Sequence, residues 1–116
     1  MIRLIRLHTG PDGQSHVERS TMPLGALGPD TATGWLPVSA ARFQSSPPGS
    51  ALDWHDAPRR QYVVTLTGTI EFTTRGGETF RLLPGVVLLA EDTAGGGHRW
   101  RLVGDEPWTR VYLQLP

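Results

Sequence analysis

The chain lacks two residue types that carry much of enzyme chemistry. It has no cysteine, which excludes thiolate nucleophiles, cysteine-ligated zinc, iron–sulfur clusters and disulfides. It also has no lysine, because every basic residue is an arginine, so no amine side chain can form a Schiff base. Histidines, carboxylates, hydroxyls and arginines are left as the groups that can carry chemistry.

Long apolar runs and concentrated charge are absent too. The first seven residues alternate between polar and apolar and lack the apolar run of a signal peptide. No segment approaches the roughly 20 apolar residues that span a membrane. The formal net charge is zero and no basic run exceeds the pair Arg59–Arg60, whereas nucleic-acid recognition needs a concentrated basic patch. We predict a cytoplasmic protein without membrane or nucleic-acid partners.

Glycine and proline, by contrast, are abundant and spread along the chain. The 116 residues include 14 glycines and 10 prolines, which separate short alternating segments. Such spacing is typical of many strands and turns rather than of long helices. The length fits a single domain over residues 1–116. About ten short strands at close spacing predict an all-β fold, either a closed antiparallel barrel or a double-sheet jelly roll.

The N-terminal third is predicted as two strands followed by an irregular loop. Residues 2–8 and 15–22 are the strands. The first is apolar on both faces, and because a barrel buries only one of them, we expect the other to meet a second copy in a homodimer. Residues 23–37 are predicted as a loop with a short helical turn near Asp30–Ala32, and Trp35 with Leu36 should fill the core or cover the pocket.

The four histidines fall into two groups in this pattern. His8 and His16 lie in the predicted N-terminal strands without ligand-like neighbours, so we interpret them as structural. His55 precedes a tight polar corner and Gln61 follows it, so both side chains can enter one cavity. Three consecutive glycines end the loop that leads to the fourth histidine, His98, and such a loop tolerates unusual backbone conformations.

The spacing of these residues resembles the cupin superfamily. Its first motif has a glycine, a His-x-His pair, a glutamate and a second glycine, and Gly49, His55, Gln61 and Gly68 follow that spacing. Its second motif, Pro-Gly before an apolar strand and a loop ending in histidine, is similar to the stretch 84–98. The resemblance covers residues 43–116, with strands and a loop over 1–42 outside it. It implies a small single-domain bacterial cupin, a jelly-roll barrel.

In metal-binding cupins, the histidines and the glutamate of these motifs hold one divalent ion. The resemblance therefore implies a site formed by His55, Gln61 and His98, for Zn, Ni, Fe or Mn. The chain departs from the family at two positions. Ala57 replaces the second histidine and Gln61 replaces the glutamate, which makes the site weaker; Asp56 is a candidate replacement carboxylate. A metal-free polar pocket formed by the same residues is the open alternative.

Six further residues are candidates for contacting a small-molecule ligand, and each has a structural alternative. They are Trp54, Arg59, Arg60, Tyr62, Asp92 and Trp100. One of the two arginines can hold a ligand carboxylate, while the other forms a surface ion pair. The aromatic rings can stack on a planar ligand or belong to the core. Asp92 can orient His98 or form only a local turn with Thr93.

Two functions remain open at this stage. The first is a metal-dependent enzyme acting on an oxygen-rich small molecule as a lyase, isomerase or oxygenase. The second is a module that binds a small ligand without metal or catalysis. A purely structural role is disfavoured, because buried polar groups cost free energy unless they are paired or used.

Overall fold

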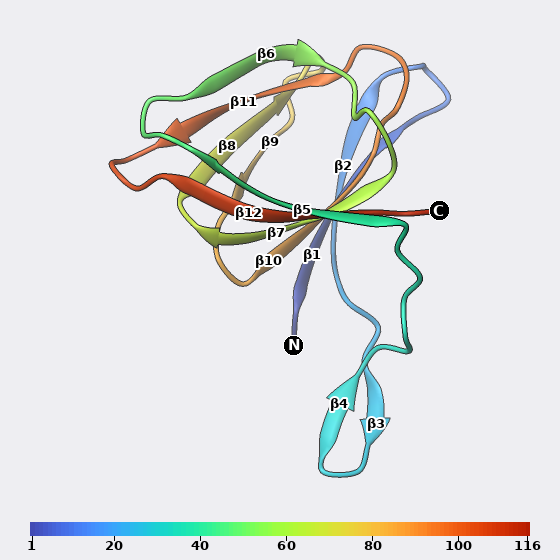
Figure 1. The fold of residues 1–116 in the computed structure, drawn as a ribbon. Helices are drawn as coiled ribbons and strands as arrows, with labels where there is room; N and C mark the ends of the chain where they lie inside the picture. Colours follow the sequence, from blue (N-terminus) through green and yellow to red (C-terminus); the bar gives the residue numbers. More distant parts are fainter.

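The structure, a computed structural model that describes residues 1–116, consists of strands without a helix. The all-β prediction is confirmed, and no helix is present that could cross a membrane. The strands are β1 (Arg3–Thr9), β2 (Ser15–Thr21), β3 (Gly25–Leu27), β4 (Asp30–Ala32), β5 (Ala40–Ser46), β6 (Ala51–His55), β7 (Gln61–Thr67), β8 (Thr69–Thr74), β9 (Thr79–Leu82), β10 (Val86–Glu91), β11 (His98–Val103) and β12 (Trp108–Gln114) (Figure 1).

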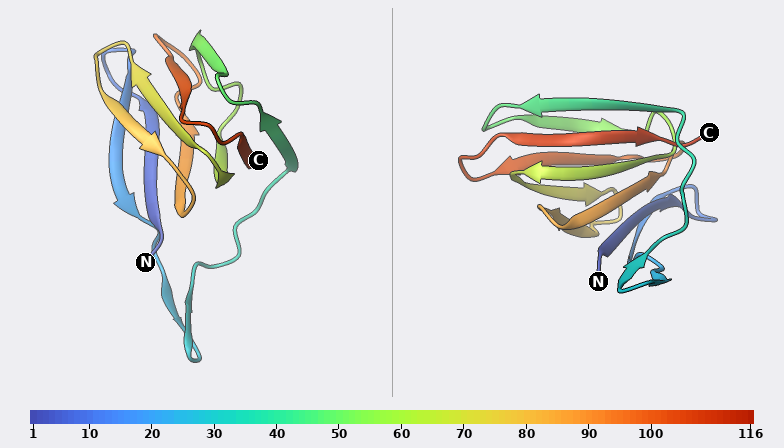
Figure 2. Two further views of the ribbon diagram at one scale, coloured as in Figure 1. Left: turned by 90° about the vertical axis from the view of Figure 1, so that its left-hand side faces the viewer. Right: turned by 60° about the horizontal axis from the view of Figure 1, so that its bottom comes forward.

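Two sheets face each other as the layers of a β-sandwich. One has six strands in the order β2-β1-β10-β7-β12-β5, and the other has four in the order β6-β11-β8-β9. Figures 1 and 2 show these layers one above the other, with β5 and β6 together on one side of the molecule. These two strands are edge strands of opposite sheets and are consecutive in the chain. The sandwich is therefore open beside them.

Of the two architectures that the sequence left open, the closed antiparallel barrel is not what the structure shows. The two sheets do not close, and β1 runs parallel to β10, with Ile5 opposite Leu88. A parallel pair needs a long connection rather than a tight turn. Here the chain between β1 and β10 includes most of the molecule. Alternation of polar and apolar residues identifies strands, but it does not reveal the direction of a partner so distant in sequence.

The core between the sheets is built from alternate positions of each strand. On β10, Val86, Leu88 and Ala90 are buried, while the residues between them are only partly covered. This period of two is the expected geometry of a strand with one face on the core. The core cluster contains residues of both sheets: Ile5, Leu7, Ala57, Val63, Ile70, Phe72, Phe80, Leu82, Val86, Leu88, Ala90, Leu102 and Trp108.

The segment between β2 and β5 differs most from its prediction. Asp30–Ala32 is a strand, not a helical turn, and it pairs with Gly25–Leu27 in a separate two-stranded ribbon. This hairpin projects from the sandwich as an arm (Figures 1 and 2). Trp35 is fully exposed and Leu36 is largely exposed, so neither fills the core, and neither lines the cleft described below. Both apolar side chains therefore lie on the surface of the protein and not in its core.

Candidate functional site

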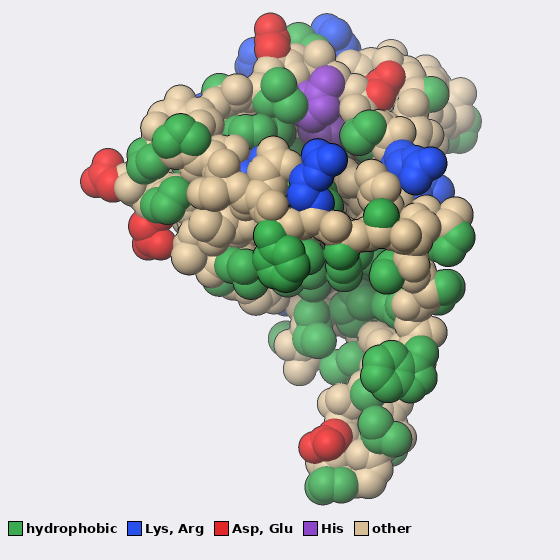
Figure 3. All heavy atoms as spheres, viewed as in Figure 1, with side chains coloured by type: hydrophobic (Ala, Val, Ile, Leu, Met, Phe, Trp, Pro, Cys, Tyr) green, Lys and Arg blue, Asp and Glu red, His purple; other side chains and the backbone are tan.

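A cleft opens between the two sheets on the side of β5 and β6. Its volume is about 690 Å³, within the range of about 300–1,000 Å³ that is typical of small-molecule sites. The six-stranded sheet contributes alternate residues of β5 and β12, and the other sheet contributes residues of β6 and β11. The lining residues are Ala40, Ala41, Arg42, Gln44, Ser46, Ser50, Ala51, Leu52, His55, Asp56, Pro58, Gln61, Trp100, Arg110, Tyr112 and Gln114. Figure 3 shows a histidine and arginine side chains at this side of the molecule.

A small inner cavity adjoins the cleft. It has a volume of about 40 Å³ and shares His55, Pro58, Gln61, Trp100 and Tyr112 with the cleft. His98 lines only this inner cavity. The structure therefore brings together the three residues that the motif spacing selected, His55, Gln61 and His98, at one end of the cleft.

His98 is held by a buried carboxylate. Its Nδ1 lies 2.6 Å from Oδ2 of Asp92, and the same oxygen accepts a hydrogen bond from the Ser15 hydroxyl at 2.5 Å. The exposed fraction is 4 % for His98 and 0 % for Asp92. The alternative in which Asp92 orients His98 is the one that the geometry matches. Because Nδ1 donates to the carboxylate, Nε2 is the atom left for a ligand.

His55 lies beside His98 and is fixed in the same way. The ring centroids are 4.5 Å apart and the ring planes meet at 65°. Nδ1 of His55 lies 2.7 Å from the backbone carbonyl of Asp53, and since a carbonyl only accepts, Nδ1 carries the proton. Burial lowers the pKa of His55, and the charge of His98 lowers it further. The neutral ring therefore keeps a free lone pair on Nε2.

The backbone places the two histidines opposite each other. His98 on β11 is the cross-strand partner of His55 on β6, and the register shifts just beyond this pair. Gly97 has a φ of 72°, and a Cβ at this position would collide with the carbonyl of His55. The glycine is thus required for both its conformation and this close approach. The triple-glycine loop does more than leave His98 unhindered: it lets the loop pack directly on the corner after β6.

The donor atoms around the inner cavity do not match a resident metal site. They are two imidazole nitrogens and the neutral amide of Gln61, which forms no side-chain hydrogen bond within the protein. Ala57 is buried where the family has a histidine, and Asp56 lines the wide cleft but not the inner cavity. No group of three histidine, aspartate or glutamate side chains is placed to hold an ion. A dication would therefore lack a compensating ligand charge.

The six predicted ligand residues separate into two sets. Trp100 lines both cavities, and Asp92 supports His98 from behind. The other four lie elsewhere. Trp54 packs against two guanidinium groups, of Arg75 at 4.5 Å and Arg99 at 4.9 Å, and lines neither cavity.

The arginine pair and Tyr62 also lie outside the cleft lining. Arg60 forms an ion pair at 2.6 Å with Glu91, which also pairs with Arg6. Glu91 is partly buried, which alone would raise its pKa, but the hydrogen bonds from both arginines lower that pKa overall. Arg59 donates to the side chain of Gln114 at the rim. Tyr62 belongs to the opposite face of β7 from Gln61 and Val63.

Sequence reasoning missed the three residues of β12 that line the cleft, which are Arg110, Tyr112 and Gln114. Arg110 is 2 % exposed, and its Nε donates to the hydroxyl of Tyr112 at 3.1 Å. In the segment 108–114, Trp108, Arg110, Tyr112 and Gln114 alternate with Thr109, Val111 and Leu113. That alternation puts Arg110 and Tyr112 on the face of Trp108, which is in the core. The alternation along residues 108–114 could therefore have identified Arg110, but an arginine in a strand is easily assigned to the solvent-facing side.

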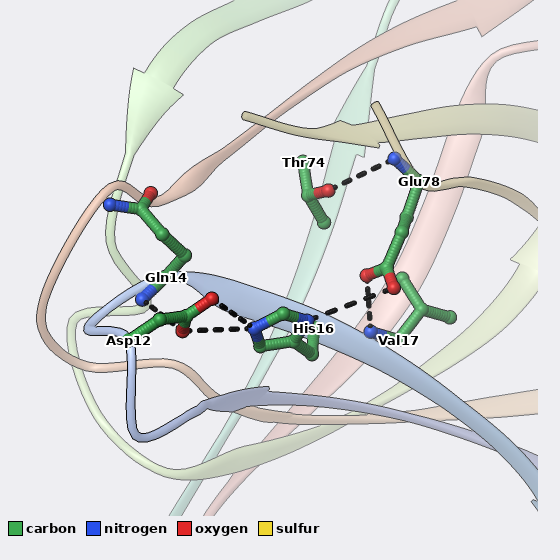
Figure 4. A network of polar contacts seen from close by, with 6 residues as sticks. All are labelled: Asp12, Gln14, His16, Val17, Thr74 and Glu78. Atoms are coloured by element: carbon green, nitrogen blue, oxygen red, sulfur yellow. Dashed lines mark hydrogen bonds and ion pairs between the residues drawn. The ribbon is translucent and has the colours of Figure 1, made fainter. Parts of the chain in front are cut away.

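The second histidine group forms a separate network away from the cleft. His16 lies 2.9 Å from both carboxylate oxygens of Asp12 and 3.7 Å from Glu78 (Figure 4). Glu78 also accepts a hydrogen bond from the backbone of Val17, which joins the N-terminal hairpin to the turn between β8 and β9. His8 packs against His16, with ring centroids 6.0 Å apart. Neither histidine lines the cleft, so both are structural in this arrangement.

A scan against protein-family models found no matching family, and a search of curated proteins found no match.

Proposed function

We propose that this protein is a small cupin whose cleft binds an oxygen-rich organic molecule and whose His98–Asp92 pair moves a proton on it. The observation that carries the proposal is the buried carboxylate 2.6 Å from Nδ1 of His98, at the inner end of a cleft of about 690 Å³. A carboxylate behind an imidazole fixes its tautomer and supports proton uptake at the opposite nitrogen. The reaction class that such a pair serves is that of an isomerase or a lyase.

The cavity also offers groups for the charge that develops on the molecule. When Nε2 of His98 removes a proton from a carbon next to a carbonyl, the electron pair moves to the carbonyl oxygen as an enolate. The hydroxyl of Tyr112 accepts from Arg110, so its own proton is available to that oxygen. The amide of Gln61 lines the same cavity and can donate to a further oxygen, whereas the unprotonated Nε2 of His55 can accept a hydrogen bond from a hydroxyl of the molecule. Placing donors where charge develops is a large source of catalysis.

Proton exchange with solvent tests the proposal directly. We expect the protein to accelerate exchange at the carbon next to the carbonyl of pyruvate or dihydroxyacetone in D₂O, followed by proton NMR. Replacing the general base, in His98→Asn, should reduce this rate by about 10²–10⁴-fold. Circular dichroism should show that the variant keeps the strand content of the parent. Binding of these molecules without any exchange would instead favour a non-catalytic binding module.

The outer face of the six-stranded sheet supports a homodimer. Most residues that point outward from β5, β7, β10 and β12 are apolar, and Ser45, Glu91 and Thr109 are polar exceptions. The apolar ones are Phe43, Tyr62, Val64, Leu66, Val87, Leu89, Val111 and Leu113. Phe43 and Leu66 are exposed. Hydrophobic side chains gather beneath the sandwich, on the side where the β3–β4 arm projects (Figure 3). Such a continuous apolar face is typical of an interface.

Light scattering on two variants tests the dimer. Leu66→Glu places a charge on the exposed part of the apolar face and should shift the protein to a monomer. Arg101→Ser changes an exposed side chain on the other sheet, where Arg101 pairs with Glu71, and should leave the mass unchanged. A monomeric parent protein at micromolar concentration would contradict this part of the proposal.

A further inference from the structure

Arg110 is a buried cation without a carboxylate partner. It is 2 % exposed, and it takes part in none of the ion pairs of the molecule, whereas Arg6, Arg60, Arg81 and Arg101 each have a glutamate. Burying an unpaired charge is costly, and an arginine cannot escape the cost by losing its proton. The positive charge of Arg110 is therefore compensated either by its neutral neighbours alone or by a ligand that binds in the cleft.

The neighbours of Arg110 use three of its five N–H donors. Nε donates to Tyr112 at 3.1 Å, and Nη1 donates to the Ser46 hydroxyl at 2.8 Å and to the Trp108 carbonyl at 3.0 Å. Nη2 has no protein acceptor, and it is not among the fully buried polar atoms that lack a partner. Nη2 thus reaches the open volume of the cleft, which Arg110 lines.

Aromatic rings hold the guanidinium group in place. Its Cζ lies 3.8 Å from the ring centroid of Trp108, 5.4 Å from that of Tyr112 and 6.0 Å from that of Trp100. These contacts stabilise the cation, but they do not neutralise it. The donors of a guanidinium group lie in its plane, which is the direction in which carboxylates bind.

The charges along the cleft also favour an anion. Arg42 on β5 is the only other arginine of the lining, and it is the cross-strand partner of Tyr112. The single acidic side chain of the lining is Asp56. The remaining polar residues are neutral amides, serines, a tyrosine and the neutral His55. The cleft therefore carries more fixed positive than negative charge, at the end formed by β5 and β12.

We propose that Arg110 binds a carboxylate group of the cleft's ligand, so that the natural ligand is a small organic acid. One guanidinium nitrogen with the nearby Ser46 hydroxyl suits a singly charged planar group better than a phosphate, which needs more donors and more positive charge. Arg110 and His98 both adjoin one aromatic cluster, since Phe72 lies 5.7 Å from His98 and 6.2 Å from Trp108 between ring centroids. This inference rests on the proposed function for the use of the cleft, and it adds the chemical class of the ligand.

Calorimetry on the full chain tests the carboxylate subsite with simple probes. Benzoate should bind and its uncharged analogue benzamide should not, while inorganic phosphate should bind more weakly than benzoate. Arg110→Gln should weaken benzoate binding at least about tenfold, the usual effect of losing a charge-assisted hydrogen bond. Arg101→Gln removes an exposed arginine outside the cleft and serves as the matched control. Arg42→Gln should weaken binding less than Arg110→Gln.

The outcomes separate this inference from the proposed function. Equal affinity of the parent and Arg110→Gln for benzoate, or equal affinity of the parent for benzoate and benzamide, would overturn the inference even if pyruvate exchanges. If Arg110→Gln does not fold, two other measurements test the inference. They are the comparison of benzoate with benzamide on the parent protein and the benzoate affinity of Arg42→Gln. Arginine-dependent benzoate binding without any proton exchange would leave the inference standing and refute the proposed function.

Discussion

Two histidine–carboxylate pairs occupy neighbouring parts of this molecule, and they differ mainly in their access to water. His98 and Asp92 are buried and 2.6 Å apart. His16 and Asp12 are 2.9 Å apart, and their side chains are 38 % and 53 % exposed. The first pair adjoins a cavity, whereas the second lies on the surface within the β1–β2 hairpin (Figure 4). Identical chemical groups thus serve a candidate site in one place and a structural contact in the other.

Strand β2 connects the two pairs. Ser15 faces inward and donates to Asp92, and the next residue, His16, faces outward toward Asp12 and Glu78. Adjacent residues of a strand point to opposite faces, so one step along the chain changes a buried contact into an exposed one. Inside the protein each hydrogen bond is electrostatically stronger and each loss is more costly, while water weakens the outer pair. The comparison predicts that matched substitutions have unequal effects.

The largest difference is expected between Asp92→Asn and Asp12→Asn. An amide at position 92 presents N–H groups as well as an oxygen, which disfavours the tautomer of His98 that keeps Nε2 free. The rate of proton exchange on pyruvate should fall by about 10²–10⁴-fold. The free energy of unfolding should fall by about 1–3 kcal/mol, because His98 and Ser15 share one charged acceptor that the variant lacks. Asp12→Asn should leave the exchange rate unchanged. Urea denaturation and NMR exchange measure the two effects.

An equal response of both variants would contradict this comparison. If Asp92→Asn lost stability but kept the full exchange rate, the buried pair would be a structural contact like the outer one. Ser15→Ala provides the control, because it removes the second hydrogen bond to Asp92 and leaves His98 paired. We expect this control to reduce stability but to keep most of the exchange activity.

The strands themselves could be predicted because each carries its own signal. Residues 62–66 are rich in β-branched and aromatic residues, and residues 86–90 are apolar at every position, which predicts a strand in each case, although the second strand is fully buried on one face only. The order of strands in the sheets carries no such local signal. The parallel pairing of β1 with β10 depends on contacts between residues more than eighty positions apart, for example Arg3 and Val86. A pattern confined to neighbours along the chain does not contain that information.

The candidate site was predictable where a motif spacing described it. His55, Gln61 and His98 line one cavity, although nothing in their spacing showed that Asp92 would hold Nδ1 of His98. Arg110 could not be recognised in the same way. Its role depends on the absence of a carboxylate nearby, which only the arrangement of β5 and β12 reveals.

The arm was mispredicted for a related reason. Trp35 is the type of residue that usually enters a core, yet in this chain it is fully exposed. If the outer face of the six-stranded sheet forms a dimer, the arm projects on the side where the second copy would lie. A sequence pattern reports that a residue is apolar, and it does not distinguish its own core from a neighbouring molecule.

The smallest expected effect concerns the pH dependence of two histidines with opposite pKa shifts. The hydrogen bond to Asp12, with the charge of Glu78 in addition, raises the pKa of His16. Burial lowers the pKa of His55. In the unfolded chain both should titrate near about pH 6.5. The stability that protonated His16 adds is therefore fully present below that pH and is lost as pH rises through its folded-state pKa.

His55 should show the opposite sign. Its folded form resists protonation, so the related stability is fully present above about pH 6.5 and is lost as pH falls from there toward its folded-state pKa. Urea unfolding of the parent, His16→Asn and His55→Asn at about pH 5.5 and pH 8, on either side of that value, measures both trends. His16→Asn should be more damaging at the lower pH, and His55→Asn should be less damaging there. Because other groups titrate equally in all three proteins, the differences report these histidines alone. NMR titration of the ring protons should give a higher pKa for His16 than for His55. The urea and NMR experiments should agree on this order. If both pKa values shifted in the same direction, burial at the cleft would not distinguish the two histidines.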